Sequence, residues 1–185
     1  PPCAETSTAL MAGVERSAAR RAGGALVYNG RHHCTGTLIG PRKVLTAGHC
    51  VSGYSASRMR FVLGESIFSP SAVLAVSRLE PHPAYSGVRN DIGLVYLASD
   101  VANVASMRVL TEMTQSFVGT ELLFVGYGVE NGYNNSGSGI KRAVTIPVAS
   151  VDSSTFSYRG TRNTCGGDSG GPPFYQTADG ELYLA

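Results

Sequence analysis

The sequence predicts an all-β fold. Runs rich in Val, Leu, Thr and Tyr are short, and 23 Gly and 9 Pro separate them at close intervals. No long segment keeps the 3.6-residue apolar period of an amphipathic helix. The 185 residues are 43% hydrophobic and only 15% charged, which supplies enough apolar material for a buried core. We therefore expect one or two small globular units built of strands.

Six strand-like runs occur in the first hundred residues. Each is closed by Gly, Pro, Ser or Asn, which are typical of turns. The runs cover 26–28, 35–39, 43–47, 59–63, 72–79 and 93–97. So many short strands in so little sequence predict a small barrel. Residues 1–24 are rich in Pro, Ala, Ser and Arg and indicate an extended N-terminal arm, of the kind left by a propeptide.

A second unit follows the barrel. The stretch 100–118 has mixed polarity and is expected to connect the two units. The apolar run 122–125 begins the second unit, and a loop rich in Gly, Asn and Ser covers 130–139. Further strands are expected at 141–148 and 155–158. The predicted division is an arm at 1–24, a first barrel at 25–105 and a second barrel at 106–185.

Composition argues against two classes of partner. No apolar run reaches the roughly 20 residues that a membrane-spanning helix needs, so we expect no membrane span. The 15 Lys and Arg nearly balance the 13 Asp and Glu, and the arginines are scattered. This distribution does not build the basic face that nucleic-acid binding requires.

The cysteines favour disulfides over a metal site. They stand at 3, 34, 50 and 165, without a C-x-x-C pair or zinc-ligand spacing. Disulfides persist outside the cytoplasm, which predicts a secreted or periplasmic protein. The first residue is Pro1 rather than Met, as expected where an export signal has been removed.

The strongest sign of chemistry is the segment 165–172, Cys-Gly-Gly-Asp-Ser-Gly-Gly-Pro. A nucleophilic serine must project from a tight turn, and flanking glycines allow positive φ and the approach of a substrate. The backbone N–H groups of Gly167 and Ser169 can converge on one point, as stabilisation of an oxyanion requires. A glycine-rich hairpin loop without chemistry is the alternative. A serine nucleophile also needs a base, and the base needs a group that orients it.

Two further segments supply these groups. His49 lies in Leu-Thr-Ala-Gly-His-Cys, and Asp91 lies in Asn-Asp-Ile-Gly-Leu-Val. Together with the serine segment they resemble the three signature blocks of the chymotrypsin/trypsin family of serine proteases, in the same chain order. The resemblance extends to secreted members, bacterial ones included. Tyr127 stands where the family usually has Trp. Other landmarks in the right order are 64–65, 81–85 and 126–128.

The resemblance implies two packed, six-stranded antiparallel Greek-key barrels, the second incomplete in this chain, with the active site in the cleft between them. It implies a serine endopeptidase that works through an acyl-enzyme. His49 would be the general base, Asp91 would orient it, and Ser169 would attack the carbonyl. The N–H groups of Gly167 and Ser169 would form the oxyanion hole. Thr46 would support the carboxylate of Asp91.

The resemblance also implies a disulfide. Cys34 and Cys50 match the family's bridge beside the catalytic histidine, and two buried free thiols are the alternative. Cross-linking a loop of this length stabilises a protein by about 3 kcal/mol. Cys165 matches a half-cystine whose partner lies further along in the family. Cys3 has no obvious mate, so either these two pair atypically or their partners lie outside this chain.

Two departures concern competence. In the family, the ammonium group of a new N-terminus binds the aspartate before the serine, here Asp168. The segment 10–15 lies at the right distance before Cys34 but matches loosely, and no Arg or Lys precedes Leu10. The chain stops at Ala185, before the family's closing strands. We therefore expect a zymogen or a fragment, with an activating protease and a separate C-terminal segment as partners.

A third departure concerns specificity. The resemblance places Asn163, with Thr164, at the base of the primary specificity pocket, where trypsin-like enzymes carry Asp. A strict preference for basic side chains is therefore not expected. The family's calcium loop keeps Glu65 without a second carboxylate, which makes a poor calcium site. His32 and His33 lack a third ligand at workable spacing, so we expect no metal and no cofactor.

Two other functions fit the sequence less well. A protease-like binding module would keep the fold without turnover, and the complete His-Asp-Ser set argues against it. A hydrolase of the G-x-S-x-G type has its acid and histidine after the serine, which is the wrong chain order. Protein or peptide substrates are therefore the expected partners.

Overall fold

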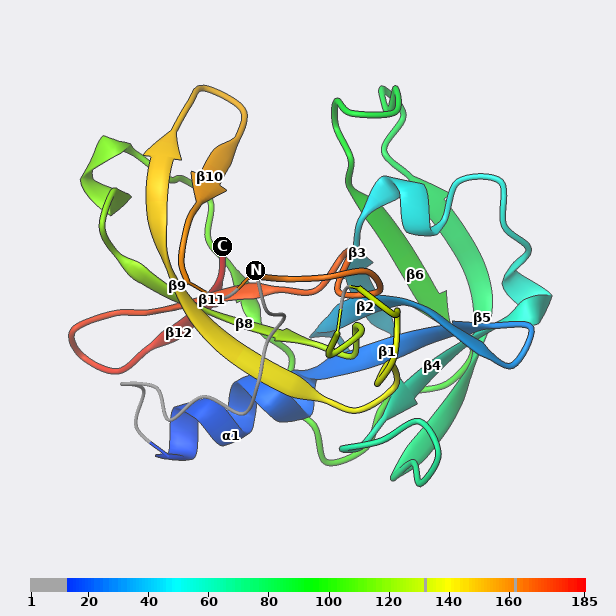
Figure 1. Ribbon diagram of the computed structural model, residues 1–185. Helices are drawn as coiled ribbons and strands as arrows, with labels where there is room; N and C mark the ends of the chain where they lie inside the picture. Colours follow the sequence, from blue (N-terminus) through cyan, green and yellow to red (C-terminus); the bar gives the residue numbers. More distant parts are fainter. Residues whose placement is uncertain (1–12, 132, 162) are drawn as a thin grey trace.

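The computed structural model describes residues 13–131, 133–161 and 163–185. Two sheets lie side by side, and the chain passes from one to the other (Figure 1). The elements are α1 (Gly13–Ala22), β1 (Gly23–Tyr28), β2 (Arg31–Gly40), β3 (Lys43–Thr46), β4 (Met59–Leu63), β5 (Ala72–Pro81), β6 (Gly93–Leu97), β7 (Arg108–Val109), β8 (Glu121–Gly126), β9 (Arg142–Val151), β10 (Phe156–Tyr158), β11 (Pro173–Gln176) and β12 (Leu182–Leu184). Three short 3-10 helices, η1 (Gly48–Cys50), η2 (Ala56–Arg58) and η3 (Gln115–Phe117), interrupt the loops.

The first six strands form a closed barrel in the Greek-key order β1-β2-β3-β6-β5-β4. All of its strand pairs are antiparallel. Side chains alternate across each strand, so Val95 and Leu97 of β6 point inward and are almost fully buried. They pack with Leu26, Leu38 and Phe61 in one apolar core. The predicted small barrel is confirmed, and β4 and β6 have the expected bounds.

The second unit is a six-stranded sheet in the order β10-β9-β8-β11-β12-β7. Its core contains Leu122, Phe124, Val144 and Ile146, which alternate along β8 and β9. The expectation of antiparallel pairing throughout is wrong for one pair, because β12 runs parallel to β7. β7 arrives from the other barrel and β12 from a hairpin with β11, so connectivity sets their relative direction. A two-residue strand has too little pattern to show this in the sequence.

The extended arm predicted for 1–24 is wrong in its second half, where α1 forms instead. Alanine has the highest helix propensity, and Arg20 and Arg21 lie in the last turn, where cations interact favourably with the helix dipole. Ala19 and Ala22 are fully buried in a cluster with Leu123 of β8. A stripe of alanines gives no strong hydrophobic period, so the sequence pattern does not reveal the helix. Residues 1–12 lie outside the described residues.

A cluster of charged groups joins α1 to both units. The guanidinium of Arg20 pairs with the carboxylate of Glu65, and the ammonium of Lys141 donates to the backbone carbonyl of Arg20. Lys141 is only 3% exposed, and burial lowers its pKa to about 8. Its nitrogen lies 5.2 Å from the ring centre of Tyr127, whose hydroxyl donates to the Gly64 carbonyl at 2.6 Å. Glu65, which the resemblance relates to a calcium loop, is therefore paired with an arginine.

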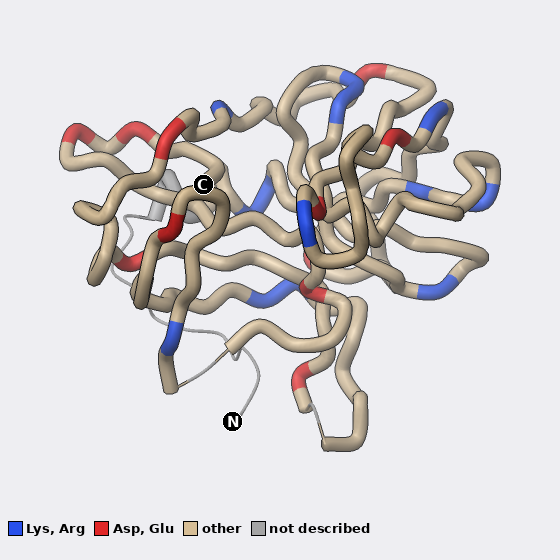
Figure 2. Tube along the Cα trace, turned by 90° about the horizontal axis from the view of Figure 1, so that it is seen from above, with Lys and Arg blue, Asp and Glu red and all other residues tan. Residues whose placement is uncertain are grey.

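Charged side chains of both signs occur along both units of the described chain (Figure 2). In the part of the chain that the structure describes, no helix combines the length and the apolar character needed to cross a membrane.

Candidate active site

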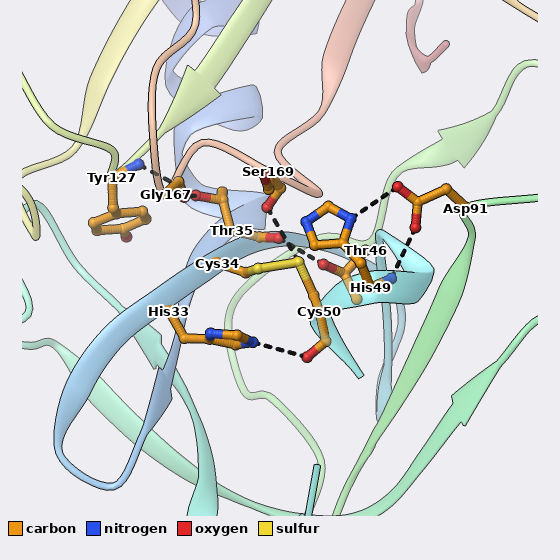
Figure 3. Close-up of a disulfide and its surroundings, with 10 residues drawn as sticks. All are labelled: His33, Cys34, Thr35, Thr46, His49, Cys50, Asp91, Tyr127, Gly167 and Ser169. Atoms are coloured by element: carbon orange, nitrogen blue, oxygen red, sulfur yellow. Dashed lines mark hydrogen bonds and ion pairs between the residues drawn. A yellow bond between two sulfur atoms is a disulfide. The ribbon is translucent and has the colours of Figure 1, made fainter. Parts of the chain in front are cut away.

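His49 and Asp91 come together at the ends of two paired strands. His49 lies in η1, directly after β3, and Asp91 lies two residues before β6. The pairing of Thr46 with Gly93 aligns these ends. His49 Nδ1 lies 2.8 Å from Asp91 Oδ2, and the backbone N–H of His49 donates to Asp91 Oδ1 at 2.8 Å. This two-point contact orients the ring and leaves Nε2 unused by Asp91 (Figure 3).

Thr46 does not support Asp91, contrary to the expectation. Its hydroxyl donates to the backbone carbonyl of Thr35 at 2.8 Å. A hydroxyl has a single proton, so none remains for a carboxylate. Thr46 instead lies under the serine turn, where Gly170 has φ +74° and an added Cβ would lie 2.1 Å from Thr46 Oγ1. Only glycine fits that position.

Ser169 is exposed in the turn before β11. Figure 3 shows the His49 ring between Asp91 and Ser169. Gly167 has φ +92°, and an added Cβ would lie 2.6 Å from the His32 ring, so this position also needs glycine. Across the described residues, the N–H groups of Gly167 and Ser169 donate to no protein acceptor. They are therefore available to an oxygen of a bound molecule.

Asp168 points away from Ser169 into the protein. Its Oδ2 accepts the Cys165 N–H at 2.8 Å and its Oδ1 accepts the Gly128 N–H at 2.8 Å. Burial raises the pKa of this carboxyl, while the two N–H groups act in the opposite direction. No described Lys, Arg or His forms an ion pair with it. Leu10, the N-terminus that the resemblance implies, lies outside the described residues.

A cavity of about 710 Å³ opens beside Ser169. Thr164 lines it, and its hydroxyl lies 2.8 Å from the Tyr158 hydroxyl. Asn163, the other residue expected in the specificity pocket, is not among the lining residues. The walls are largely apolar and include Ile39, Leu45, Ile92, Val109, Phe124, Phe156 and Tyr158.

The disulfide between Cys34 and Cys50 that the resemblance implies is present, with Cα atoms 6.1 Å apart. His49 lies beside these two sulfurs, but disulfide sulfurs are not thiolates, so this group does not hold a metal ion. Cys165 is also disulfide-bonded. Cys3 lies outside the described residues.

Sequence reasoning missed two residues that contact the serine turn. His32 lies against Gly167, and burial lowers the pKa of its imidazole to about 4. Its Nε2 is buried and has no hydrogen-bond partner among the described groups. Thr35 is fully buried, and its hydroxyl donates to the Gly167 carbonyl at 3.0 Å. Both lie in β2, far from the turn in sequence, so no local pattern could have identified them.

A Greek-key barrel beside a second six-stranded sheet, with a His-Asp pair and a glycine-flanked serine at their junction, defines the class of trypsin-like double-barrel proteins. The family model described as Trypsin matches residues 10–183. This chain belongs to the trypsin family.

Individual relatives agree with this assignment. The chain is 32% identical to Trypsin II-P29 of Gallus gallus over 78% of its length, and 28% identical to Trypsin alpha of Drosophila melanogaster over 80%. It spans 65% of the length of each of these relatives, and 24% of Serine proteinase stubble of Drosophila melanogaster. The solved structure of neuropsin, a serine protease expressed in the limbic system of mouse brain, superposes with a TM-score of 0.74 at 23% identity. That alignment covers 89% of this chain and 80% of neuropsin, and it shows the shared fold.

Proposed function

We propose that this chain is a serine endopeptidase, or the catalytic part of one, that hydrolyses peptide bonds through an acyl-enzyme. The observation that carries the proposal is the two-point contact between His49 and Asp91, next to a turn that presents Ser169 and two unused N–H groups. His49 is the proposed general base, and Asp91 is its orienting group. Membership of the trypsin family supports these roles.

The chemistry follows from these positions. Ser169 Oγ attacks the substrate carbonyl carbon while His49 Nε2 takes the hydroxyl proton. The oxyanion that forms accepts hydrogen bonds from Gly167 and Ser169. His49 then gives its proton to the leaving amine, and a water molecule repeats the sequence on the ester to release the acid. Among the described atoms Ser169 Oγ has no hydrogen bond to His49, and such contacts often tighten only when substrate binds.

Asp168 is the proposed control point for activity. Its carboxylate accepts two N–H groups, and no described cation forms an ion pair with it. We propose that an ammonium group freed by an activating protease near Leu10 binds there and orders the adjacent N–H of Gly167. Removal of one oxyanion donor lowers rates by about 10²–10³. The chain without that cleavage should therefore turn over slowly, and trimming to Leu10 in the full natural chain should raise kcat.

Protein or peptide substrates with uncharged side chains next to the cleaved bond fit the site best. The cavity beside Ser169 has apolar walls, and its carboxylates Asp91 and Asp168 already accept hydrogen bonds. The disulfides support a location outside the cytoplasm, secreted or periplasmic. Hydrolysis of peptide esters that carry Leu, Phe or Arg at this position measures the preference, and an Arg substrate that exceeds Leu and Phe would contradict it.

Covalent labelling tests the function directly. A fluorophosphonate should label Ser169 in the full natural chain, and neither Ser169→Ala nor His49→Ala should react at a comparable rate. A peptidase assay on the same three proteins should follow the labelling. Peptide binding without labelling or turnover would instead support the alternative, an inactive binding module of the same fold.

A further inference from the structure

Thr35 of β2 contacts both residues that would supply the oxyanion hole. Its side-chain hydroxyl donates to the carbonyl of Gly167 at 3.0 Å. Its backbone N–H donates to the carbonyl of Ser169 at 2.9 Å. Figure 3 shows Thr35 next to the turn that carries both residues. A single residue of the first barrel therefore fixes two points of a turn that belongs to the second unit.

The position of Thr35 is itself strongly determined. Its hydroxyl accepts the backbone N–H of Tyr127 at 3.3 Å, and its carbonyl accepts the Thr46 hydroxyl at 2.8 Å. The residue is fully buried, and a β-branched side chain has few rotamers in a strand. All of its polar groups are used, so the hydroxyl cannot reorient without leaving a buried group unpaired.

Gly167 needs such an external contact. It has no side chain to pack, and its φ of +92° lies in a region that glycine leaves easily for others. Holding its carbonyl limits rotation of the peptide plane that joins it to Asp168. The direction of the Gly167 N–H depends on the same backbone torsions. A hydrogen bond to the carbonyl thus restrains the N–H that must point at the oxyanion.

We propose that the Thr35 hydroxyl is a positioning group that holds Gly167 and Ser169 in the conformation that binds an oxyanion. The proposal rests on the proposed protease function. It assigns to Thr35 no contact with substrate and no proton transfer. Because the oxyanion exists only after attack, loss of this hydroxyl should lower kcat and leave KM nearly unchanged.

Three variants of the full natural chain test the proposal. Thr35→Val keeps the shape and removes the hydroxyl, and Thr35→Ser keeps the hydroxyl and removes the methyl. Thr37→Val is the matched control, because Thr37 lies in the same strand, is 1% exposed, and has a buried hydroxyl without a partner. We expect Thr35→Val to lower kcat about 10–100-fold with KM within about threefold. This loss is smaller than the roughly 10²–10³ that removal of an oxyanion donor costs, because both N–H groups remain. Thr35→Ser should retain most of kcat, and Thr37→Val should match the parent.

A peptide aldehyde, which binds as a tetrahedral adduct, should lose affinity in Thr35→Val in proportion to kcat. Equal losses of kcat in the Ser and Val variants would overturn the proposal, because packing of the methyl group would then be the cause. A loss of kcat no larger than in Thr37→Val would overturn it as well. If Thr35→Val does not fold, Thr35→Ala takes its place. Alanine lacks both the hydroxyl and the methyl of threonine, so its comparison with Thr35→Ser isolates the hydroxyl.

Amide hydrogen exchange separates this proposal from the proposed function. The peptide that covers 166–171 should exchange faster in Thr35→Val than in Thr37→Val, also in a Ser169→Ala background that cannot react. If the parent protein hydrolyses no peptide but this difference is present, the protease assignment fails and the positioning of the turn by Thr35 stands. Equal exchange in both variants would refute the positioning role whatever the activity.

Discussion

The two halves of the candidate site are held in different ways. In the first barrel, His49 and Asp91 contact each other directly at the ends of adjacent strands. In the second unit, the turn with Ser169 is rich in glycine and is fixed by hydrogen bonds from Thr35 of the first barrel and by those that the Asp168 carboxylate accepts. The glycines of this turn have no side chains of their own with which to hold it. Its geometry therefore depends on residues far away in the sequence, whereas the His-Asp pair depends on its own strands.

Burial separates the halves further. The side chains of His49 and Asp91 are 44% and 33% exposed. Asp168, which follows Gly167 in the chain, and His32, which contacts Gly167, are partly buried and have shifted pKa values.

The largest expected effect is on chemistry in the first half. Asp91→Asn should lower kcat by about 10³–10⁴, because an amide no longer favours the ring form in which Nε2 accepts a proton. Folding should change little, since the carboxylate is partly exposed. Steady-state kinetics and urea unfolding measure the two quantities. Asp100→Asn, which breaks an exposed ion pair with Arg42, is the control. A loss below tenfold for Asp91→Asn would show that this pair does not orient the base.

The disulfide tests how far the first barrel relies on cross-linking. Replacement of both Cys34 and Cys50 by Ala should lower the free energy of unfolding by about 3 kcal/mol, because the bridge restricts the unfolded chain across a separation of 16 residues. Urea denaturation of the double variant and the parent gives the difference. An unchanged unfolding midpoint would mean that the apolar core alone holds this barrel.

His32 of β2, which contacts the serine turn at Gly167, gives the stability of the protein a dependence on acid pH. Its folded-state pKa is about 4 against a usual 6.5, so the unfolded chain binds more protons between these values. Stability should be complete above pH 6.5 and fall by about 3 kcal/mol as pH decreases to 4. The raised pKa of Asp168 contributes with the opposite sign. The pH dependence of the unfolding free energy should flatten in His32→Phe, and parallel curves for variant and parent would contradict this.

A smaller effect is expected at the junction of the two units. The pKa of Lys141 is lowered from 10.5 to about 8, so the unfolded chain binds the extra proton between these values. Stability should rise by about 2 kcal/mol from pH 8 to pH 10, as the penalty for burying the ammonium disappears. Lys141→Met should remove the rise, and thermal unfolding over this range measures it. A rise that persists in the variant would assign the effect to another group.

The sequence by itself determined the strands and the identity of the chemical groups. The bounds of 59–63 and 93–97 agree with the structure, because alternation of side chains and turn residues are local properties. The three segments around His49, Asp91 and Ser169 were also recognisable locally, since a reactive serine needs glycines beside it and a base elsewhere in the chain.

Tertiary structure decided the partners of the remaining polar groups. Thr46 was expected to serve Asp91 and instead donates to Thr35, because strand pairing brings that carbonyl within reach of its only proton. Helix α1 depends on a surface of the second unit that buries its alanines, and the parallel pairing of β12 with β7 depends on connectivity. The sequence gives the type of each side chain. The hydrogen-bond partner of that side chain depends on which distant part of the backbone the fold brings next to it.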